Sequence, residues 1–242
     1  TNPMGHFWRG LVGTAAMGLG FTGLGLLPLP EVTAIGYAAP IFVVIFAAMF
    51  LNEQVRAFRL SAVALGMVGV IIVLSPRLSV GASLNTSETL GAVVVLMGAV
   101  LAALAHVFVR KLVATETTAA IVFWFTITSS GMALLTLPWG WVIPPLAATL
   151  MLIMAGLLGG IGQICLTSSY RFADASLVAP FDYTSMILAL MVGYFVFDEV
   201  PTMTMLVGAG IVIVAGVLII WRERRLGLQR AQQRKATGNT GI

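Results

Sequence analysis

The amino-acid sequence predicts an all-α polytopic membrane protein with eight transmembrane helices, and three observations lead there. Of the 242 residues, 59% are hydrophobic and only 9% are charged, whereas an ordinary soluble domain has about 25% charged residues. The apolar residues form eight runs that are long enough, or nearly so, to cross a hydrocarbon core of about 30 Å as helices. The basic residues gather on one side of the membrane that these runs would span.

The eight apolar runs follow one another with short connections, and turn formers such as Pro28 and Pro30 stand between them. Membrane barrel strands are a poor alternative, because such strands alternate polar and apolar residues and these runs do not. Within a few residues at each end, we place the helices at 10–27, 32–51, 60–75, 89–109, 118–138, 147–169, 176–197 and 201–221.

The basic residues indicate how the chain is threaded. If the chain begins in the cytoplasm, Arg77 alone of the 13 lysines and arginines falls on the outer side, and the other twelve, including Arg9 just ahead of the first run, fall inside. This bias follows the positive-inside rule. We therefore expect both termini in the cytoplasm, a basic cytoplasmic tail at 222–242, and location in a bacterial cytoplasmic (inner) membrane. The pI near 9.7 then reflects topology, and no nucleic-acid partner is expected.

Two segments of the chain, 36–54 and 182–200, resemble each other. When Glu53 is aligned with Glu199, Tyr37 falls opposite Tyr183. Five predicted helices separate the two copies, and because this number is odd, the copies must have opposite orientations. Inverted repeats of this kind are typical of secondary transporters. Glu53 and Glu199 themselves lie at helix junctions, where a capping role is the favoured interpretation.

The order of these features also resembles a known family. The first half contains "LPLPEVTAIGYAAPIFVVIFAAMFLNEQ", and the second contains "YRFADASLVAPFDY" and "GYFVFDEV", followed by spaced glycines at 208, 210 and 216. This combination of small residues, a proline, an apolar helix and a terminal glutamate resembles the EamA-type family of the drug/metabolite transporter superfamily. The resemblance implies two inverted five-helix repeats and transport of small metabolites, among which amino acids recur.

Compared with that family pattern, the chain shows eight helices where ten are expected. We interpret residues 1–75 as a partial first repeat of three helices and residues 89–221 as a complete second repeat of five. Two more helices are expected before Thr1, so the chain is interpreted as a truncated form. The expected partners are a small-molecule substrate and the lipid bilayer, with a homodimer left open. No cofactor or metal is expected.

Three unusual residues are predicted to lie at one depth in the membrane. Asp182, Gln163 and Trp124 each fall six residues, or about 9 Å, from the cytoplasmic end of their runs. A charged side chain at the centre of a membrane helix costs about 2.5–3.5 kcal/mol, so such residues usually face protein or a water-filled cavity. We interpret them as substrate-pathway residues. The alternatives are that Asp182 only fixes helix packing, that Gln163 only joins helices, and that Trp124 faces lipid.

Three further positions complete the predicted pathway, and two prolines interrupt its helices. Tyr183 lies one residue deeper than Asp182, Tyr37 mirrors it as an outward gate, and His106 is added although an interfacial position is the simpler interpretation. Pro40 and Pro180 each remove a backbone donor and free a carbonyl one turn earlier. Glycines such as Gly156 and Gly160 are expected to allow close helix approach.

We infer a secondary transporter that moves small organic metabolites such as amino acids by alternating access, with export as the expected direction. The first alternative is a helical membrane scaffold without transport. A membrane-embedded enzyme is less favoured, because the sequence contains neither HExxH nor GxSxG and its two histidines form no obvious reacting group.

Overall fold

The computed structural model describes two compact units of the chain. Its described residues are 2–27, 29–51, 57–78 and 86–197, with short stretches at 203–204, 206–208, 210–211, 214–215, 218 and 221–222. Unit 1 comprises Thr1–Gln54 and Ala82–Ala179, and unit 2 comprises Val55–Gly81 and Pro180–Ile242. Every regular element in the described ranges is a helix, which confirms the all-α part of the prediction.

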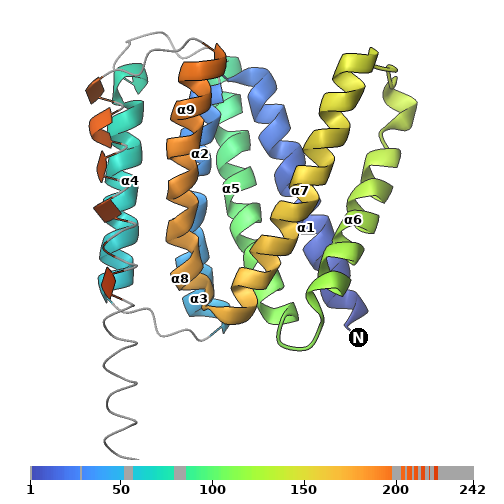
Figure 1. Cartoon of the computed structure of the whole chain (residues 1–242), viewed down its shortest axis with the longest axis horizontal. Coiled ribbons are helices and arrows are strands. Elements are labelled where there is room, and N and C mark those ends of the chain that lie inside the picture. Colours follow the sequence, from blue (N-terminus) through green and yellow to red (C-terminus); the bar gives the residue numbers. More distant parts are fainter. Residues whose placement is uncertain are drawn as a thin grey trace, which may run out of the picture. The chain divides into compact units, whose positions relative to one another are not determined.

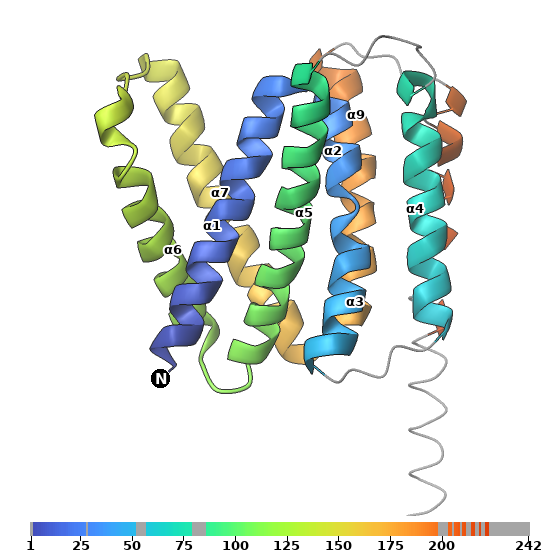
Figure 2. The ribbon, with the colours of Figure 1, turned by 180° about the vertical axis from the view of Figure 1, so that it is seen from behind.

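Unit 1 is a helix bundle built around α1 and α5. These two helices pack along each other, α6 lies on another side of α1, and α2 and α3 pack against α5 (Figure 1, Figure 2). The elements of the unit are α1 (Pro3–Leu26), α2 (Leu29–Gly36), α3 (Ala39–Leu51), α5 (Thr86–Leu112), α6 (Thr118–Leu134), the 3₁₀ helix η1 (Leu137–Trp139), α7 (Leu146–Phe172) and α8 (Ala175–Val178).

The first helix begins earlier than the apolar run that predicted it. Asn2 is its N-cap, with a side chain that accepts a hydrogen bond from the Gly5 N–H at 3.0 Å, and Pro3 occupies the first turn, where a missing N–H does no harm. Arg9 therefore lies inside α1 and is buried, whereas we expected it ahead of the first span. The physical reason is that the cap and proline start the helix before the hydrophobic stretch does.

The second predicted run, 32–51, is divided into α2 and α3. Helix α2 ends at Gly36 and α3 begins at Ala39, with Pro40 in its first turn. Tyr37 lies at this junction, where its N–H donates to the Thr33 carbonyl at 3.1 Å and its side chain is buried. Proline is tolerated at the start of a helix because it has no N–H to satisfy, so the chain can restart its helix here.

Small residues let α1 approach its neighbours closely. A methyl group added at Gly10 would lie 2.6 Å from Thr128 of α6, and one added at Gly23 would lie 2.2 Å from Val95 of α5. Gly156 and Gly160, which we expected to serve this purpose, have no atom of the described residues within 4 Å of an added methyl. That expectation was wrong, because those glycines lie on the open side of α7.

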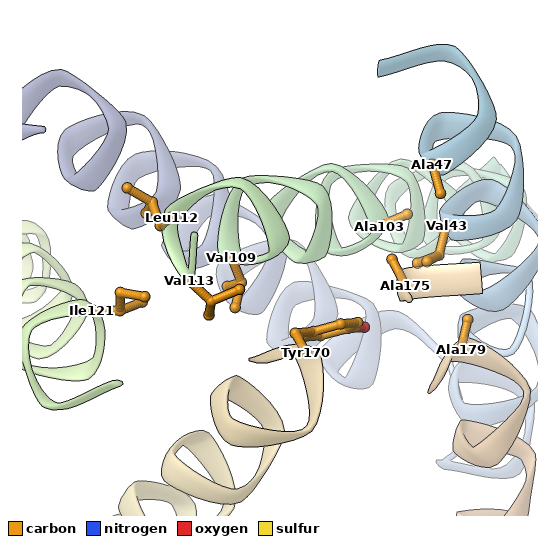
Figure 3. Packing of buried hydrophobic residues seen from close by; sticks show 10 residues of the cluster. All are labelled: Val43, Ala47, Ala103, Val109, Leu112, Val113, Ile121, Tyr170, Ala175 and Ala179. Atoms are coloured by element: carbon orange, nitrogen blue, oxygen red, sulfur yellow. The ribbon is translucent and has the colours of Figure 1, made fainter. Parts of the chain in front are cut away.

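The apolar core of unit 1 joins the ends of α5 and α7 to α3 (Figure 3). Tyr170, near the end of α7, is fully buried beside Val109 of α5 and Val113, the residue that follows α5. The chain then turns so that Ala175 and Ala179 pack against α3. This arrangement fixes the last turns of α7 against α5.

The outer surface of α7 is almost entirely apolar. Its exposed residues include Leu150, Met154, Leu158 and Ile161, each more than half accessible. Exposed apolar patches of this extent mark a surface that contacts lipid or a partner. By length and composition, two of the described helices could cross a bilayer, Thr89–Leu112 and Leu146–Phe172, and Ala39–Leu51, Leu60–Gly69 and Thr118–Leu134 are shorter apolar helices.

Unit 2 contains α4 (Ala57–Leu78), η2 (Ala179–Thr184, of which all but the first residue belong to this unit) and α9 (Ser185–Phe197). The predicted run 176–197 is thus interrupted by a 3₁₀ turn that includes Pro180, Asp182 and Tyr183. Ser185 Oγ donates to the Asp182 carbonyl oxygen at 2.6 Å. Glu53, Glu199 and the tail beyond Arg222 lie outside the described residues, as does much of the predicted run 201–221.

Candidate functional site

A pocket of about 190 Å³ lies among four helices of unit 1. Three polar side chains line it, one each from α1, α5 and α7: Arg9, His106 and Gln163. The rest of its lining is apolar and mostly small, consisting of Gly13, Ala16, Met17, Ala102, Ala105, Phe125 and Leu166. This combination, an apolar cavity with a few convergent polar groups, is the usual character of a small-molecule site.

Helical spacing explains why these residues meet. On α1, Arg9, Gly13 and Ala16 are four and three residues apart and so share one face. On α7, Gln163 and Leu166 are three residues apart and face the same way. Gly13 makes room for the Arg9 guanidinium, because a methyl group added there would lie 2.6 Å from Arg9 Nη1.

Arg9 is the dominant polar group of the pocket. Its side chain is only 4% exposed, its Nη2 donates to Gln163 Oε1 at 2.9 Å, and its guanidinium carbon lies 3.6 Å from the ring centroid of Phe125. The latter distance is that of a cation–π contact. Arg9 Nε and Nη1 are buried and find no hydrogen-bond acceptor within the described part of the chain. Since arginine stays protonated in proteins, a buried positive charge with unused donors borders the cavity.

His106 belongs to the same pocket. Its Nδ1 is buried without a hydrogen-bond partner among the described residues, and its ring centroid lies 5.6 Å from that of Tyr170. The sequence alone favoured an interfacial position for this histidine. In the structure α5 extends to Leu112, so His106 lies six residues before the end of its helix, and its side chain lines the pocket together with residues of α1 and α7.

The other predicted pathway residues do not line this pocket. Trp124 is 48% exposed, and its ring centroid lies 6.2 Å from that of His6. Tyr37 is buried at the junction of α2 and α3. Asp182, which is partly buried, and Tyr183 belong to unit 2, whereas unit 1 forms the pocket.

A second polar cluster ties the start of α1 to the loop between α5 and α6. Glu116 Oε1 accepts the Asn2 N–H at 2.7 Å, and its Oε2 lies 3.7 Å from His6 Nε2. Arg171, near the end of α7, donates to the Glu116 carbonyl at 2.6 Å and to the Val113 carbonyl at 3.1 Å. The hydrogen bond from the Asn2 N–H holds the pKa of Glu116 below its usual value, since it stabilises the charged carboxylate.

The residue types in unit 1 limit the chemistry that this site can perform. No group of three or more histidine, cysteine, aspartate or glutamate side chains that could hold a metal occurs among the described residues. The pocket lining offers an arginine, an amide and an imidazole, which can hydrogen-bond a solute but lack a nucleophile beside a base.

Comparison with known proteins decides the family. The sequence pattern of the EamA-like transporter family matches residues 4–75 and 89–222, which is most of the chain. The chain belongs to the EamA-like transporter family. It is accordingly a membrane protein, and the names found in this family point to transport and not to an enzyme.

The relatives of this EamA-like chain are named as transporters of different solutes. It is 28% identical over 225 residues to an S-adenosylmethionine uptake transporter of Rickettsia bellii (strain RML369-C), covering 93% of this chain and 75% of that protein. It is 28% identical over 229 residues to a riboflavin transporter of Rhizobium johnstonii, covering 92% and 72%. It is 28% identical over 215 residues to the pseudopaline exporter CntI of Pseudomonas aeruginosa, covering 87% and 72%.

The fold also matches that of a solved protein. A crystal structure of a protein superimposes on this EamA-like chain with a TM-score of 0.75 at 19% sequence identity, covering 93% of this chain and 78% of the other. At that identity the match speaks to the fold alone.

Proposed function

We propose that this EamA-like protein is a secondary transporter that moves small organic metabolites, amino acids among them, across the bacterial cytoplasmic membrane by alternating access. The observation that carries the proposal is the Arg9 pocket, a mostly apolar cavity with three convergent polar side chains inside a bundle whose α7 surface is apolar. Buried charges are rare in membrane helices and mark solute pathways. A scaffold protein without transport would gain nothing from an unsatisfied cation beside an open cavity.

The arrangement that we propose is that of two inverted repeats with cytoplasmic termini. The family match in two stretches, 4–75 and 89–222, supports the repeat, and the one-sided distribution of basic residues supports the orientation. Alternating access would then exchange the roles of the two repeats around a central site. Export is the proposed direction; the relative named as a pseudopaline exporter supports it, whereas the relatives named as uptake transporters point the other way.

Asp182 provides a direct test of the proposed pathway. A carboxylate six residues into a membrane run can carry a proton or bind a substrate ammonium group. We expect Asp182→Asn to insert and fold normally and to reduce flux by at least about tenfold, corresponding to about 1.4 kcal/mol. Flux is measured in proteoliposomes over a panel of labelled metabolites, with a proton gradient imposed in each direction.

A matched variant separates a pathway role from a general effect of losing a carboxylate. Asp174 Oδ1 lies 3.3 Å from Arg110 Nη2 at the end of α7, so Asp174→Asn should weaken this junction and leave the flux per folded molecule nearly unchanged. Equal flux in the wild-type and Asp182→Asn proteins would contradict a pathway role for Asp182. Absence of flux for every solute of the panel would contradict transport itself.

A further inference from the structure

We propose that the Arg9 pocket binds the carboxylate group of the solute, so that this protein selects organic monoanions or zwitterions whose carboxylate pairs with the Arg9 guanidinium. The inference deepens the proposed function, on which it rests, by naming a substrate class for the same pocket. It starts from the unused donors of a single buried side chain.

The first step concerns the charge of the pocket. Arginine carries five N–H donors and stays protonated, and only its Nη2 is used, in the 2.9 Å hydrogen bond to Gln163. Among the residues that the structure describes, the pocket lining contains no aspartate or glutamate. An unpaired charge in an apolar surrounding is strongly unfavourable, so an anion that enters the pocket gains both a partner charge and the free donors of Nε and Nη1.

The second step concerns the geometry of the guanidinium. Phe125 covers one of its faces at 3.6 Å, which leaves the N–H groups as the part of the guanidinium that a ligand can satisfy. Nε and Nη1 are buried in the structure, so a ligand must displace the groups that cover them. Gly13 lies against Nη1, because a methyl group there would lie 2.6 Å from this atom, so the missing side chain at this position lets the guanidinium fit beside α1. A planar group with two oxygens matches these N–H groups, since carboxylates accept paired N–H donors from arginine.

The third step decides between a carboxylate and a phosphate. Of the described residues that line the pocket, Arg9 is the single lysine or arginine, and Gln163 and His106 are the other polar ones. One fixed positive charge balances a monoanion, whereas a phosphate monoester carries nearly two negative charges at neutral pH. The small apolar lining residues on α1 and α5 would then contact the remainder of the solute.

The experiment compares carboxylic acids with their neutral amides. Purified protein in detergent micelles is heated with each member of a panel of common amino acids, S-adenosylmethionine and short mono- and dicarboxylic acids, and its melting temperature is measured. A ligand that binds the folded state raises this temperature. For every acid that does so, the corresponding carboxamide is titrated. We expect the acid to bind about 10- to 100-fold more tightly than the amide, the difference typical of a charge-assisted hydrogen bond.

Variants assign this preference to Arg9. In Arg9→Gln the acid and its amide should bind within about threefold of each other, and Arg9→Lys should keep part of the preference because it keeps the charge but loses the planar donor edge. Lys111→Gln removes an equal charge from an exposed position at the end of α5 and should bind like the wild type. Gly13→Ala, which crowds Arg9 Nη1, should weaken acid binding if Arg9→Gln fails to fold.

The outcomes distinguish this inference from the proposed function. Binding of amides as tightly as acids, an unaltered preference in Arg9→Gln, or no stabilisation by any acid of the panel would overturn the carboxylate site. Flux of neutral and acidic solutes alike through the wild-type protein would overturn it while leaving transport intact. Arg9-dependent binding of acids without flux of any of them would support the site and contradict the transport proposal.

Discussion

At the scale of single residues, the pocket depends on which side of a helix each residue faces. Phe125 packs against Arg9, whereas its neighbour Trp124 is half-exposed. Successive residues of a helix point about 100° apart. An estimate of depth in the membrane is nearly the same for Trp124 and Phe125, so it cannot tell which of the two lines the cavity. The sequence therefore predicted a polar layer that includes Gln163, and only the structure shows that Arg9 is its partner.

Arg9 could have been found from the sequence by a different signal. The Asn-Pro pair at residues 2 and 3 is a typical helix start, and it places Arg9 inside α1, where its charge requires an explanation. Because Arg9 was counted among the basic residues that flank the first apolar run, its position inside α1 was missed. The place of His106 was harder to predict from the sequence, because it depends on how far α5 continues past the apolar run into Arg110 and Lys111.

Glu116 gives a pH-dependent prediction at this scale. Its pKa is lowered in the folded state, foremost by the hydrogen bond from the Asn2 N–H. A depressed carboxyl pKa stabilises the fold above the ordinary value of 4.5, and this contribution is lost as the pH falls through the folded-state pKa. We expect Glu116→Gln to lower the melting temperature at neutral pH and to differ less from the wild type in acid.

The control for Glu116 is Glu88→Gln, a similar change in the first turn of α5. Melting curves of the three proteins are recorded from neutral pH to below 4.5 in one detergent. A difference between Glu116→Gln and the wild type that stays constant over this range would show that the charge of Glu116 does not stabilise the start of α1.

At the scale of elements, hydropathy located the helices but not their interruptions. The runs at 89–109 and 147–169 lie within α5 and α7, because long apolar stretches are helical wherever water is absent. The junction at Tyr37 and the 3₁₀ turn η2 depend on local backbone geometry. Pro40 and Pro180 indicated both regions, but a proline can begin a helix as well as end one.

The approach of α1 to α6 gives a prediction for these elements. An alanine at Gly10 would place its methyl group 2.6 Å from Thr128 Cβ, whose short side chain cannot move far. We expect Gly10→Ala to lower the free energy of unfolding by about 1–3 kcal/mol, as overpacking typically does. Unfolding is measured by titration with sodium dodecyl sulfate in mixed micelles.

Gly18 provides the matched control on the same helix. In the part of the chain that the structure describes, nothing lies within 4 Å of a methyl group added there, so Gly18→Ala should be neutral or stabilise by up to about 1 kcal/mol through helix propensity. Equal effects of the two substitutions would mean that α1 and α6 do not meet at Gly10.

At the scale of the whole molecule, composition and family agree on a membrane transporter fold. The low charge content, the apolar surface of α7 and the match to the EamA-like transporter family all point to a lipid environment. Composition was sufficient for this conclusion, because about a quarter of the residues would be charged in a soluble domain. The identity of the solute was not predictable from the sequence, since it depends on how a small number of polar groups converge in one pocket.

The central claim is that unit 1 holds a water-accessible pocket with convergent polar groups behind a lipid-facing surface. Its most direct test is the reaction of thiols with a charged, water-soluble thiosulfonate in proteoliposomes. Cys165 is exposed on α7, where the account places lipid, and Ala102 lines the pocket. We expect Cys165 to stay unreacted in the otherwise unchanged protein and the thiol introduced by Ala102→Cys, in a Cys165→Ser background, to react. An unreactive thiol at position 102 beside a reactive Cys165 would contradict the account.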